Sequence, residues 1–179
     1  MLCVLMNVGF ISMGKQWKSK KFQYSVGDYM MKDEILIRRF QLSDFDDLNK
    51  LLSDPEVMRF IEPPYSPEQT KDFLFSAGLC DIPLVYAVEN EKHFLGYVIF
   101  HEYDADSFEL GWVLGKKYWG MGYASVITEI LVSKAAEMKK DLVIECVPGQ
   151  EATKHIALAN GFTYIGNIDG LDVFRLKIR

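Results

Sequence analysis

The 179-residue chain has little cysteine, little histidine and no long hydrophobic run. Its three cysteines, Cys3, Cys80 and Cys146, are far apart, and the sequence contains neither a Cys-x-x-Cys pair nor a Cys/His cluster with metal-ligand spacing. These absences argue against a disulfide framework and against a zinc site. We therefore expect free thiols in a reducing cytoplasm and no bound metal.

An excess of positive charge is also missing. Twenty lysines and arginines against 25 aspartates and glutamates give a net charge of −5, which disfavours nucleic acid and anionic membranes as partners and favours a cationic amine substrate. The apolar residues 1–14 are fewer than the roughly 20 that span a bilayer. They also precede a lysine cluster, which reverses the order of a secretory signal, so we expect no association with a membrane.

The length fits one domain, but the first residues differ from the rest. Residues 1–31 carry a net charge of +3, whereas residues 32–179 carry −8. Residues 1–30 are an interfacial basic tail, a disordered leader or an upstream stretch included by a misjudged start codon, and we favour the last two. The functional unit is then residues 31–179, about 150 residues, and a chain that begins at Met31 is expected to fold.

The hydrophobic pattern predicts a mixed α+β domain with one strand–helix–strand crossover in its second half. Ser66, Pro67 and Gln69 form a helix start of the capping-box type, and residues 58–65 lack a clear period, which is typical of a surface loop. Three successive strand-like runs indicate an antiparallel meander. The predicted strands are 34–40, 84–88, 94–101, 108–114, 142–147, 162–165 and 171–178, and the predicted helices begin at Ser43, Ser66, Gly120 and Ala152.

The most informative segment joins the strand at 108–114 to the long helix that follows it. Gly120 and Gly122 stand where that helix begins, so the backbone can approach a ligand, and the unpaired N–H groups of a first helical turn attract phosphate. Lys116 and Lys117 add positive charge in an acidic domain. A tight turn with solvated lysines explains the glycine pair equally well.

The run Lys117-x-x-Gly120-x-Gly122-Tyr123-Ala124, after the strand Phe-Glu-Leu-Gly-Trp-Val-Leu, resembles the acetyl-CoA-binding motif of the GNAT superfamily of N-acetyltransferases. More narrowly, it is similar to the branch that contains the ribosomal-protein N-terminal acetyltransferases. The similarity extends from about Ile35 to Lys177 and includes Asp-Pro-Glu-Val-Met-Arg-Phe at 54–60. It implies the GNAT fold, a central mixed and mostly antiparallel sheet flanked by helices. It also implies direct acetyl transfer from acetyl-CoA to a primary amine.

The resemblance also implies a set of cofactor contacts. Val113 and Leu114 would hold the pantetheine arm through their backbone, and Lys117 stands where the family usually has glutamine or arginine. Gln150 aligns with an asparagine of the family and Thr153 with a serine. The N–H groups that would cradle the pyrophosphate belong to Gly120, Met121, Gly122, Tyr123 and Ala124.

The resemblance makes Glu109 the candidate general base, acting through water on an amine that is mostly protonated at neutral pH. A free strand N–H near Val113 would stabilise the oxyanion. The tyrosine that many relatives use as general acid aligns with Ala157, so Tyr123 is a substitute to consider. Cys146 is expected to be a small buried hydrophobe.

The acceptor side is less defined. By family analogy Glu62 and Tyr65 are acceptor contacts, and His101 is the histidine with a chance of facing the acceptor cleft. The acceptor amine is a protein N-terminus or a small molecule, and the enzyme is a monomer or a homodimer.

Two alternatives remain open. Because Ala157 replaces the usual tyrosine, the chain could be a non-catalytic acyl-CoA-binding or sensor module on the same fold. The spacing Gly120-x-Gly122-x-x-Ser125, with Asp141 about twenty residues on, superficially mimics a dinucleotide-binding fingerprint. Ser125 breaks that fingerprint, and a strand meander precedes it where a βαβ unit should begin.

Overall fold

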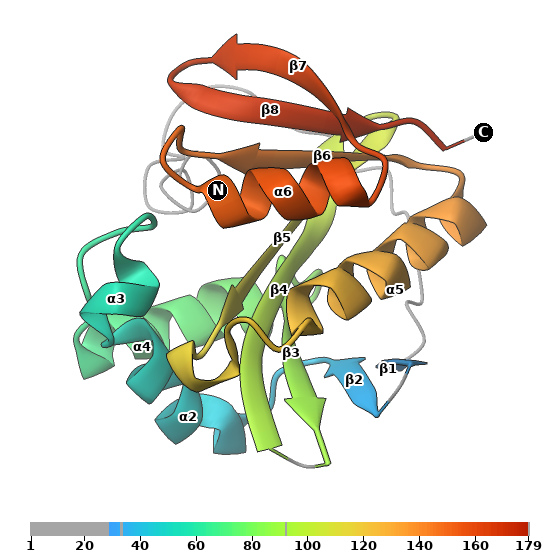
Figure 1. The fold of residues 1–179 in the computed structure, drawn as a ribbon. Coiled ribbons are helices and arrows are strands. Elements are labelled where there is room, and N and C mark those ends of the chain that lie inside the picture. Colours follow the sequence, from blue (N-terminus) through green and yellow to red (C-terminus); the bar gives the residue numbers. More distant parts are fainter. Residues whose placement is uncertain (1–28, 33, 92, 179) are drawn as a thin grey trace, which may run out of the picture.

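The computed structural model describes residues 29–32, 34–91 and 93–178, which form one eight-stranded sheet flanked by helices (Figure 1). The strand order is β1-β2-β3-β4-β5-β6-β8-β7. Only β5 and β6 run parallel, and every other neighbouring pair is antiparallel. The strands are β1 (Tyr29–Lys32), β2 (Ile35–Arg38), β3 (Val85–Asn90), β4 (His93–Asp104), β5 (Ser107–Leu114), β6 (Asp141–Cys146), β7 (Thr163–Ile168) and β8 (Leu171–Leu176). This arrangement confirms the mixed fold class, and the meander β3–β4–β5 leaves no all-parallel βαβ frame for a dinucleotide.

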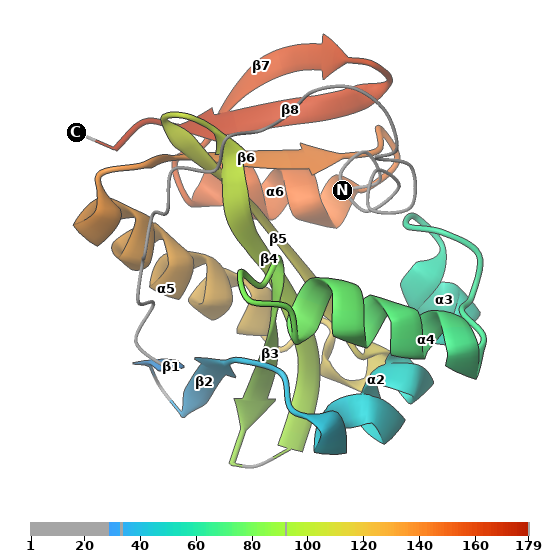
Figure 2. The same cartoon turned by 180° about the vertical axis from the view of Figure 1, so that it is seen from behind.

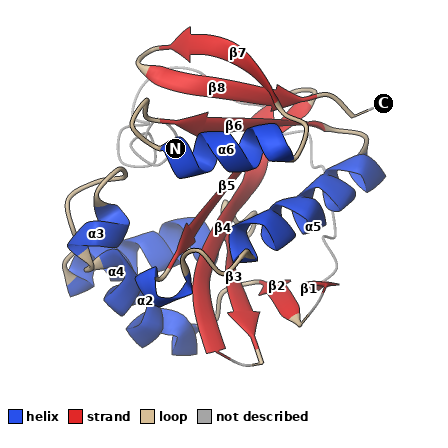
Figure 3. Cartoon of the chain, viewed as in Figure 1, coloured by secondary structure: helices blue, strands red, loops and turns tan. Residues whose placement is uncertain are grey.

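Helices cover both faces of the sheet (Figures 1 and 3). The first set and its short extensions are η1 (Leu42–Asp44), α2 (Phe45–Leu52), α3 (Pro55–Met58), α4 (Pro67–Phe73) and the π-helical η2 (Leu74–Gly78). The second set is the 3₁₀ turn η3 (Lys116–Tyr118), α5 (Tyr123–Met138) and α6 (Glu151–Ala159). Within the described residues, no helix is long and apolar enough to cross a membrane.

Two hydrophobic cores lie on opposite faces of the sheet, because successive strand residues point to opposite sides. Phe100 and Leu110 pack with α5 on one face, in front of the sheet in Figure 1. Tyr97, Ile99 and Val113 pack with α2, α3 and α4 on the other, which Figure 2 shows from behind. The sheet therefore separates a face for α5 and α6 from a face for α2 to α4.

The helix boundaries partly match the predicted ones. The capping box of α4 is confirmed, since the Gln69 N–H donates to Ser66 Oγ and the Ser66 N–H donates to Gln69 Oε1. The helix start at Ser43 is wrong, because the Asp44 carboxylate accepts the Gln41 N–H and the chain enters α2 through a 3₁₀ turn.

The loop predicted at residues 58–65 is wrong only in where it begins. Asp54 accepts the N–H groups of Glu56 and Val57 and so starts the short helix α3, which includes Met58. The Asp54-Pro55 pair is thus a helix start, with proline in the first turn.

Strand β1 is a second feature that the sequence pattern did not predict. It pairs antiparallel with β2, from Tyr29 opposite Arg38 to Lys32 opposite Ile35. Four residues at a sheet edge are too few to display a two-residue period. The boundary expected before Met31 falls inside this strand, and residues 1–28 lie outside the described residues.

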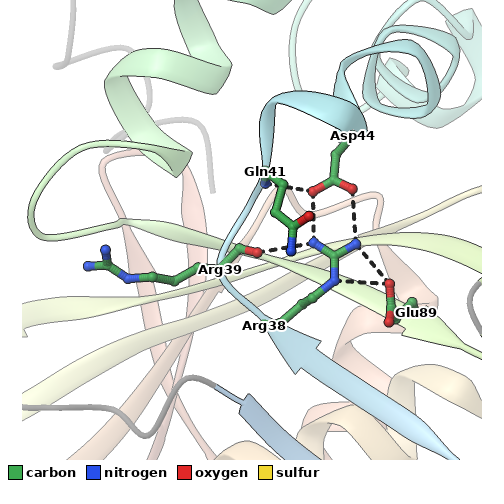
Figure 4. A network of polar contacts seen from close by, with 5 residues as sticks. All are labelled: Arg38, Arg39, Gln41, Asp44 and Glu89. Atoms are coloured by element: carbon green, nitrogen blue, oxygen red, sulfur yellow. Dashed lines mark hydrogen bonds and ion pairs between the residues drawn. The ribbon is translucent and has the colours of Figure 1, made fainter.

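A charged network fastens the first helical layer to the sheet (Figure 4). Both terminal nitrogens of Arg38 in β2 donate hydrogen bonds to the Asp44 carboxylate, at 2.8 and 2.9 Å. Its Nε donates to Glu89 of β3 at 2.9 Å. The side chains of all three are less than a fifth exposed. The planar guanidinium matches two carboxylates at once, which a lysine cannot do. The network sets the direction in which the chain leaves β2 toward α2.

Candidate active site

The sheet opens between its two parallel strands. Pairing of β5 with β6 covers only residues 107–109 opposite residues 141–143. Farther along, β5 stays paired with β4 and β6 stays paired with β8, so the two strands diverge and expose facing edges (Figure 1). We call this opening the wedge. An extended ligand can take the place of a strand there, because each open edge offers unused backbone groups.

The register identifies which residues of β5 offer those groups. Gly115 N–H donates to Leu95 O at 2.8 Å, and antiparallel partners alternate in direction, so Val113 directs its N–H toward β4. Trp112 and Leu114 direct theirs toward the wedge. The Leu114 N–H thus faces the wedge, whereas Val113 contributes a buried side chain. Trp112, which the sequence pattern did not single out for this role, offers a second wedge-facing N–H.

The first turn of α5 lies at the far end of β5 and presents a row of unpaired donors. Gly120 and Gly122 have φ of 72° and 85°, and a Cβ at either would meet nothing within 4 Å. Left-handed backbone, not close packing against the protein, is therefore what requires glycine here. Within the described part of the chain, the five N–H groups from Gly120 to Ala124 donate to no residue. Such a turn, with the positive end of the helix dipole, suits a phosphate.

The two lysines before this turn differ in their partners. Lys116 pairs with Glu56 of α3, so its charge is already used within the protein. Lys117 is exposed, and its Nζ lies 4.7 Å from the centre of the Tyr118 ring. Of the two, Lys117 is the cation available to a bound anion.

Gln150 and Thr153 lie at the start of α6, on the same sheet face as α5 (Figure 1). Gln150 Oε1 accepts the Val147 N–H at 3.1 Å and its own N–H donates to Val147 O, which closes the turn after β6. Its amide oxygen therefore already has a donor, and only its NH₂ remains for a ligand. Thr153 is partly buried one turn into the helix.

Glu109 lies at the base of the wedge and is 1% exposed. His101 of β4 is its cross-strand partner, and His101 Nε2 lies 3.3 Å from Glu109 Oε2. His101 Nδ1 lies 3.0 Å from the carbonyl of Glu102; a carbonyl can only accept, so Nδ1 carries a proton. At this distance a protonated His101 forms an ion pair with the Glu109 carboxylate, although no well-directed hydrogen bond from a described residue reaches Oε2.

The pKa of His101 is raised. Burial alone lowers that pKa, but the Glu109 carboxylate and the Glu102 carbonyl outweigh it, and the result lies above the ordinary value near 6.5. A raised folded-state pKa gives stability that is complete below about pH 6.5 and is lost as the pH rises through the folded value.

We therefore expect the melting temperature of the wild type to fall between pH 6 and pH 9 by more than that of His101→Gln. Thermal unfolding monitored by circular dichroism at several pH values measures this difference. The exposed His155 supplies the control, because His155→Gln should keep the wild-type pH profile. Parallel profiles for wild type and His101→Gln would contradict a raised pKa of His101 in the folded protein.

Tyr123, the substitute general acid suggested by the sequence, lies far from Glu109. The Tyr123 hydroxyl accepts a hydrogen bond from Asn90 at 3.3 Å, at the end of β3 opposite His93. His93 is eight residues along β4 from His101, or about 26 Å at 3.3 Å per residue. Tyr123 is therefore no acid for chemistry beside Glu109, and Ala157 is fully buried in the core.

The cysteine expectation holds where it can be examined. Cys146 is buried, and burial raises its pKa to about 11, so it remains a thiol at neutral pH. Cys80 is also free, and Cys3 lies outside the described residues. In the described segments no three His, Cys, Asp or Glu side chains gather closely enough to hold a metal ion.

Aromatic residues pack on the α2–α4 face of the sheet near the end of β5. The Tyr65 hydroxyl donates to Glu62 Oε2 at 2.8 Å, and burial together with this carboxylate raises the pKa of Tyr65. The Tyr65 ring packs on Phe73, which packs on the fully buried Tyr97, the partner of Val113 across the sheet. Glu62 is thereby held in one position relative to the sheet.

Comparison with known proteins identifies the family. Residues 34–163 match the acetyltransferase (GNAT) domain family, which uses acetyl-CoA. An uncharacterized N-acetyltransferase, YnaD of Bacillus subtilis, is 26% identical over 133 residues, which cover 69% of this chain and 78% of that protein.

Solved structures share the fold. A GNAT-family acetyltransferase from Bacillus anthracis superposes with a TM-score of 0.76 at 22% identity, over 83% of this chain and 98% of that one. RimL, a ribosomal L7/L12 alpha-N-protein acetyltransferase in complex with coenzyme A, superposes with a TM-score of 0.73 at 18% identity, over 84% and 98%. None of these comparisons supports a non-catalytic module. Since the domain match covers most of the chain, the chain belongs to the GNAT family and is an N-acetyltransferase that transfers an acetyl group to an amine.

Proposed function

We propose that this enzyme binds acetyl-CoA along the wedge and acetylates a primary amine that approaches from the side of α2 to α4. The supporting observation is the alignment of two sets of unused backbone donors, the β5 edge at Trp112 and Leu114 and the first turn of α5. Bound acetyl-CoA would supply the acetyl group as a thioester. The β5 edge suits an amide-bearing pantetheine arm, and the α5 turn suits a pyrophosphate.

Further contacts to the cofactor follow from position. Lys117 adds a cation beside the α5 turn, and Gln150 and Thr153 offer an amide and a hydroxyl from α6. The side chain of Val113 packs in the wall below the β5 edge. These roles belong to the same proposal as the α5 turn.

Glu109 is proposed as the base, with His101 as its positioning partner. An alkylamine has a pKa near 10 and is mostly protonated at neutral pH, so a group must accept its proton. His101 Nε2 lies 3.3 Å from one carboxylate oxygen, and Glu109 lies where the wedge closes, so the backbone of the proposed proton acceptor has a fixed place relative to both strands. A leaving thiol with a pKa near 8.5 needs no dedicated acid, which fits the buried alanine at position 157.

Cofactor binding can be tested at Gly122, because its φ of 85° is strained for any other residue. Gly122→Ala is expected to raise the KM for acetyl-CoA about tenfold or more, since a left-handed alanine costs roughly 1–2 kcal/mol and the turn relaxes away from its donor geometry. Gly170→Ala is the matched control: Gly170 has a φ of 88° and open space at its Cβ, but it lies in the β7–β8 turn. Equal KM values in both variants would contradict the proposed phosphate site.

The acceptor is proposed to be a small amine or a protein N-terminus, and neither nucleic acid nor a membrane is an expected partner. The acidic net charge argues against nucleic acid and anionic membranes as partners. A location in the cytoplasm is part of the same proposal. The enzyme is proposed to act as a monomer or a homodimer. Release of coenzyme A thiol with a panel of amines tests the acceptor class, and thermal stabilisation by acetyl-CoA without any acetylated amine would favour a sensor.

A further inference from the structure

An open groove of about 450 Å³ lies beside the wedge and is not used by the chemistry described above. Its volume falls within the roughly 300–1,000 Å³ of small-molecule sites. Most of its lining is apolar, and its two charged members are Arg59 and Glu62. The lining residues are Pro55, Met58, Arg59, Phe60, Ile61, Glu62, Pro63, Pro64 and Val147.

The groove is connected to the wedge through the end of β6. Val147 follows the last residue of β6, whose open edge forms one side of the wedge. Phe60 reaches the same turn, because a Cβ on Gly149 would lie 3.5 Å from the Phe60 ring. A ligand in this groove would therefore contact both the turn after β6 and the segment that follows α3.

Glu62 and Arg59 differ in whether another residue of the protein already binds them. Glu62 already accepts the Tyr65 hydroxyl. The Arg59 guanidinium is exposed and its Cζ lies 5.0 Å from the centre of the Phe60 ring, but it forms no hydrogen bond or ion pair with a described residue. A cation–π contact of this kind favours one placement of the guanidinium and leaves its donors unused. A guanidinium presented in this way matches a carboxylate, which it can bind through two parallel hydrogen bonds.

We propose that the acceptor is a small apolar amine that also carries a carboxylate, an apolar amino acid or a short peptide, and that Arg59 binds this carboxylate. The inference rests on the proposed function, which supplies the requirement for an amine at the wedge. The apolar lining binds the body of the acceptor, and Arg59 selects for its anionic end.

The test compares acceptors that differ only in the carboxylate. L-leucine and L-leucinamide, and L-leucyl-L-leucine and its amide, are assayed by thiol release with wild type, Arg59→Met and Arg59→Lys. The kcat/KM ratio of acid to amide is expected to fall about tenfold or more in Arg59→Met and to be partly restored in Arg59→Lys. Differences in amine basicity cancel, because they are the same for every variant. Comparison of L-leucine with L-leucyl-L-leucine shows whether the groove accepts a free amino acid or a short peptide.

A second readout does not require turnover. N-acetyl-L-leucine and N-acetyl-L-leucinamide are titrated calorimetrically into protein with coenzyme A present. Arg59→Met should weaken binding of the first about tenfold and leave the second unchanged. Arg39→Met is the control, since Arg39 is also exposed but donates to Asp81 O away from the groove.

The outcomes separate the two proposals. If amines are acetylated but substitution of Arg59 changes neither the acid-to-amide ratio nor the binding constants, the carboxylate site is overturned and the proposed function stays intact. Binding of N-acetyl-L-leucine that depends on Arg59, without acetylation of any amine, would support the site and contradict the proposed function.

Discussion

Replacing Glu109 by glutamine is expected to lower kcat by about 10²–10⁴-fold, the contribution typical of a positioned acid or base. Glutamine has nearly the shape of glutamate but accepts no proton at neutral pH. The protein should remain folded, because Glu109 is 1% exposed and its neutral replacement leaves no buried charge. Thiol release under saturating acetyl-CoA and amine measures kcat, and a thermal melt verifies folding.

Glu102→Gln is the matched control for this experiment. Glu102 follows His101 on the same strand but is exposed, so its substitution should leave kcat within about twofold of the wild type. Raising the pH increases the fraction of the substrate amine that is unprotonated. If Glu109 is the base, this increase restores the activity of Glu109→Gln only in part. A variant with Glu109→Gln that keeps wild-type turnover would remove Glu109 from the chemistry without affecting the family assignment.

Removing the central cation of the network in Figure 4 is expected to have the largest effect on stability. Arg38→Met leaves the carboxylates of Asp44 and Glu89 facing each other without their shared partner. Breaking a fully buried pair costs roughly 3–5 kcal/mol; because these side chains are slightly exposed, we expect about 2–4 kcal/mol. This corresponds to a fall in melting temperature of roughly 5–15 °C for a domain of this size.

The exposed pair of Lys50 and Asp47 provides the comparison. Lys50→Met removes a lysine whose ion pair is largely solvated, so no measurable change in melting temperature is expected. If Arg38→Met melts like Lys50→Met, the network contributes orientation but no stability. Arg38→Lys should recover only part of the loss, because a single ammonium cannot serve both carboxylates in the same plane.

The sequence was sufficient to predict the fold class, the meander and the glycine turn before α5. The reason is local: short apolar runs bounded by polar turns mark strands such as β4, a change of period marks α5, and left-handed positions such as Gly122 require a particular residue. The capping box at Ser66 was likewise readable, because its two hydrogen bonds join residues three apart.

The features that were not predicted depend on partners far away in the chain. Pairing of His101 with Glu109 follows from the register between β4 and β5, and the choice of Trp112 over Val113 as wedge donor follows from hydrogen-bond alternation along that register. Neither is expressed in the spacing of residues along one strand. Signals of this kind become visible only when the turn at residues 104–107, which sets the register, is known.

The short contact between β5 and β6 also determines where Glu109 lies relative to the opening of the sheet. Three residue pairs join the two strands, and one hydrophobic core under α5 packs on both sides of this junction. Glu109 belongs to the last of the three pairs, opposite Val143. Its backbone is therefore anchored at the point where the strands part, so acceptors of different bulk in the wider part of the wedge would all meet the proposed base at the same place.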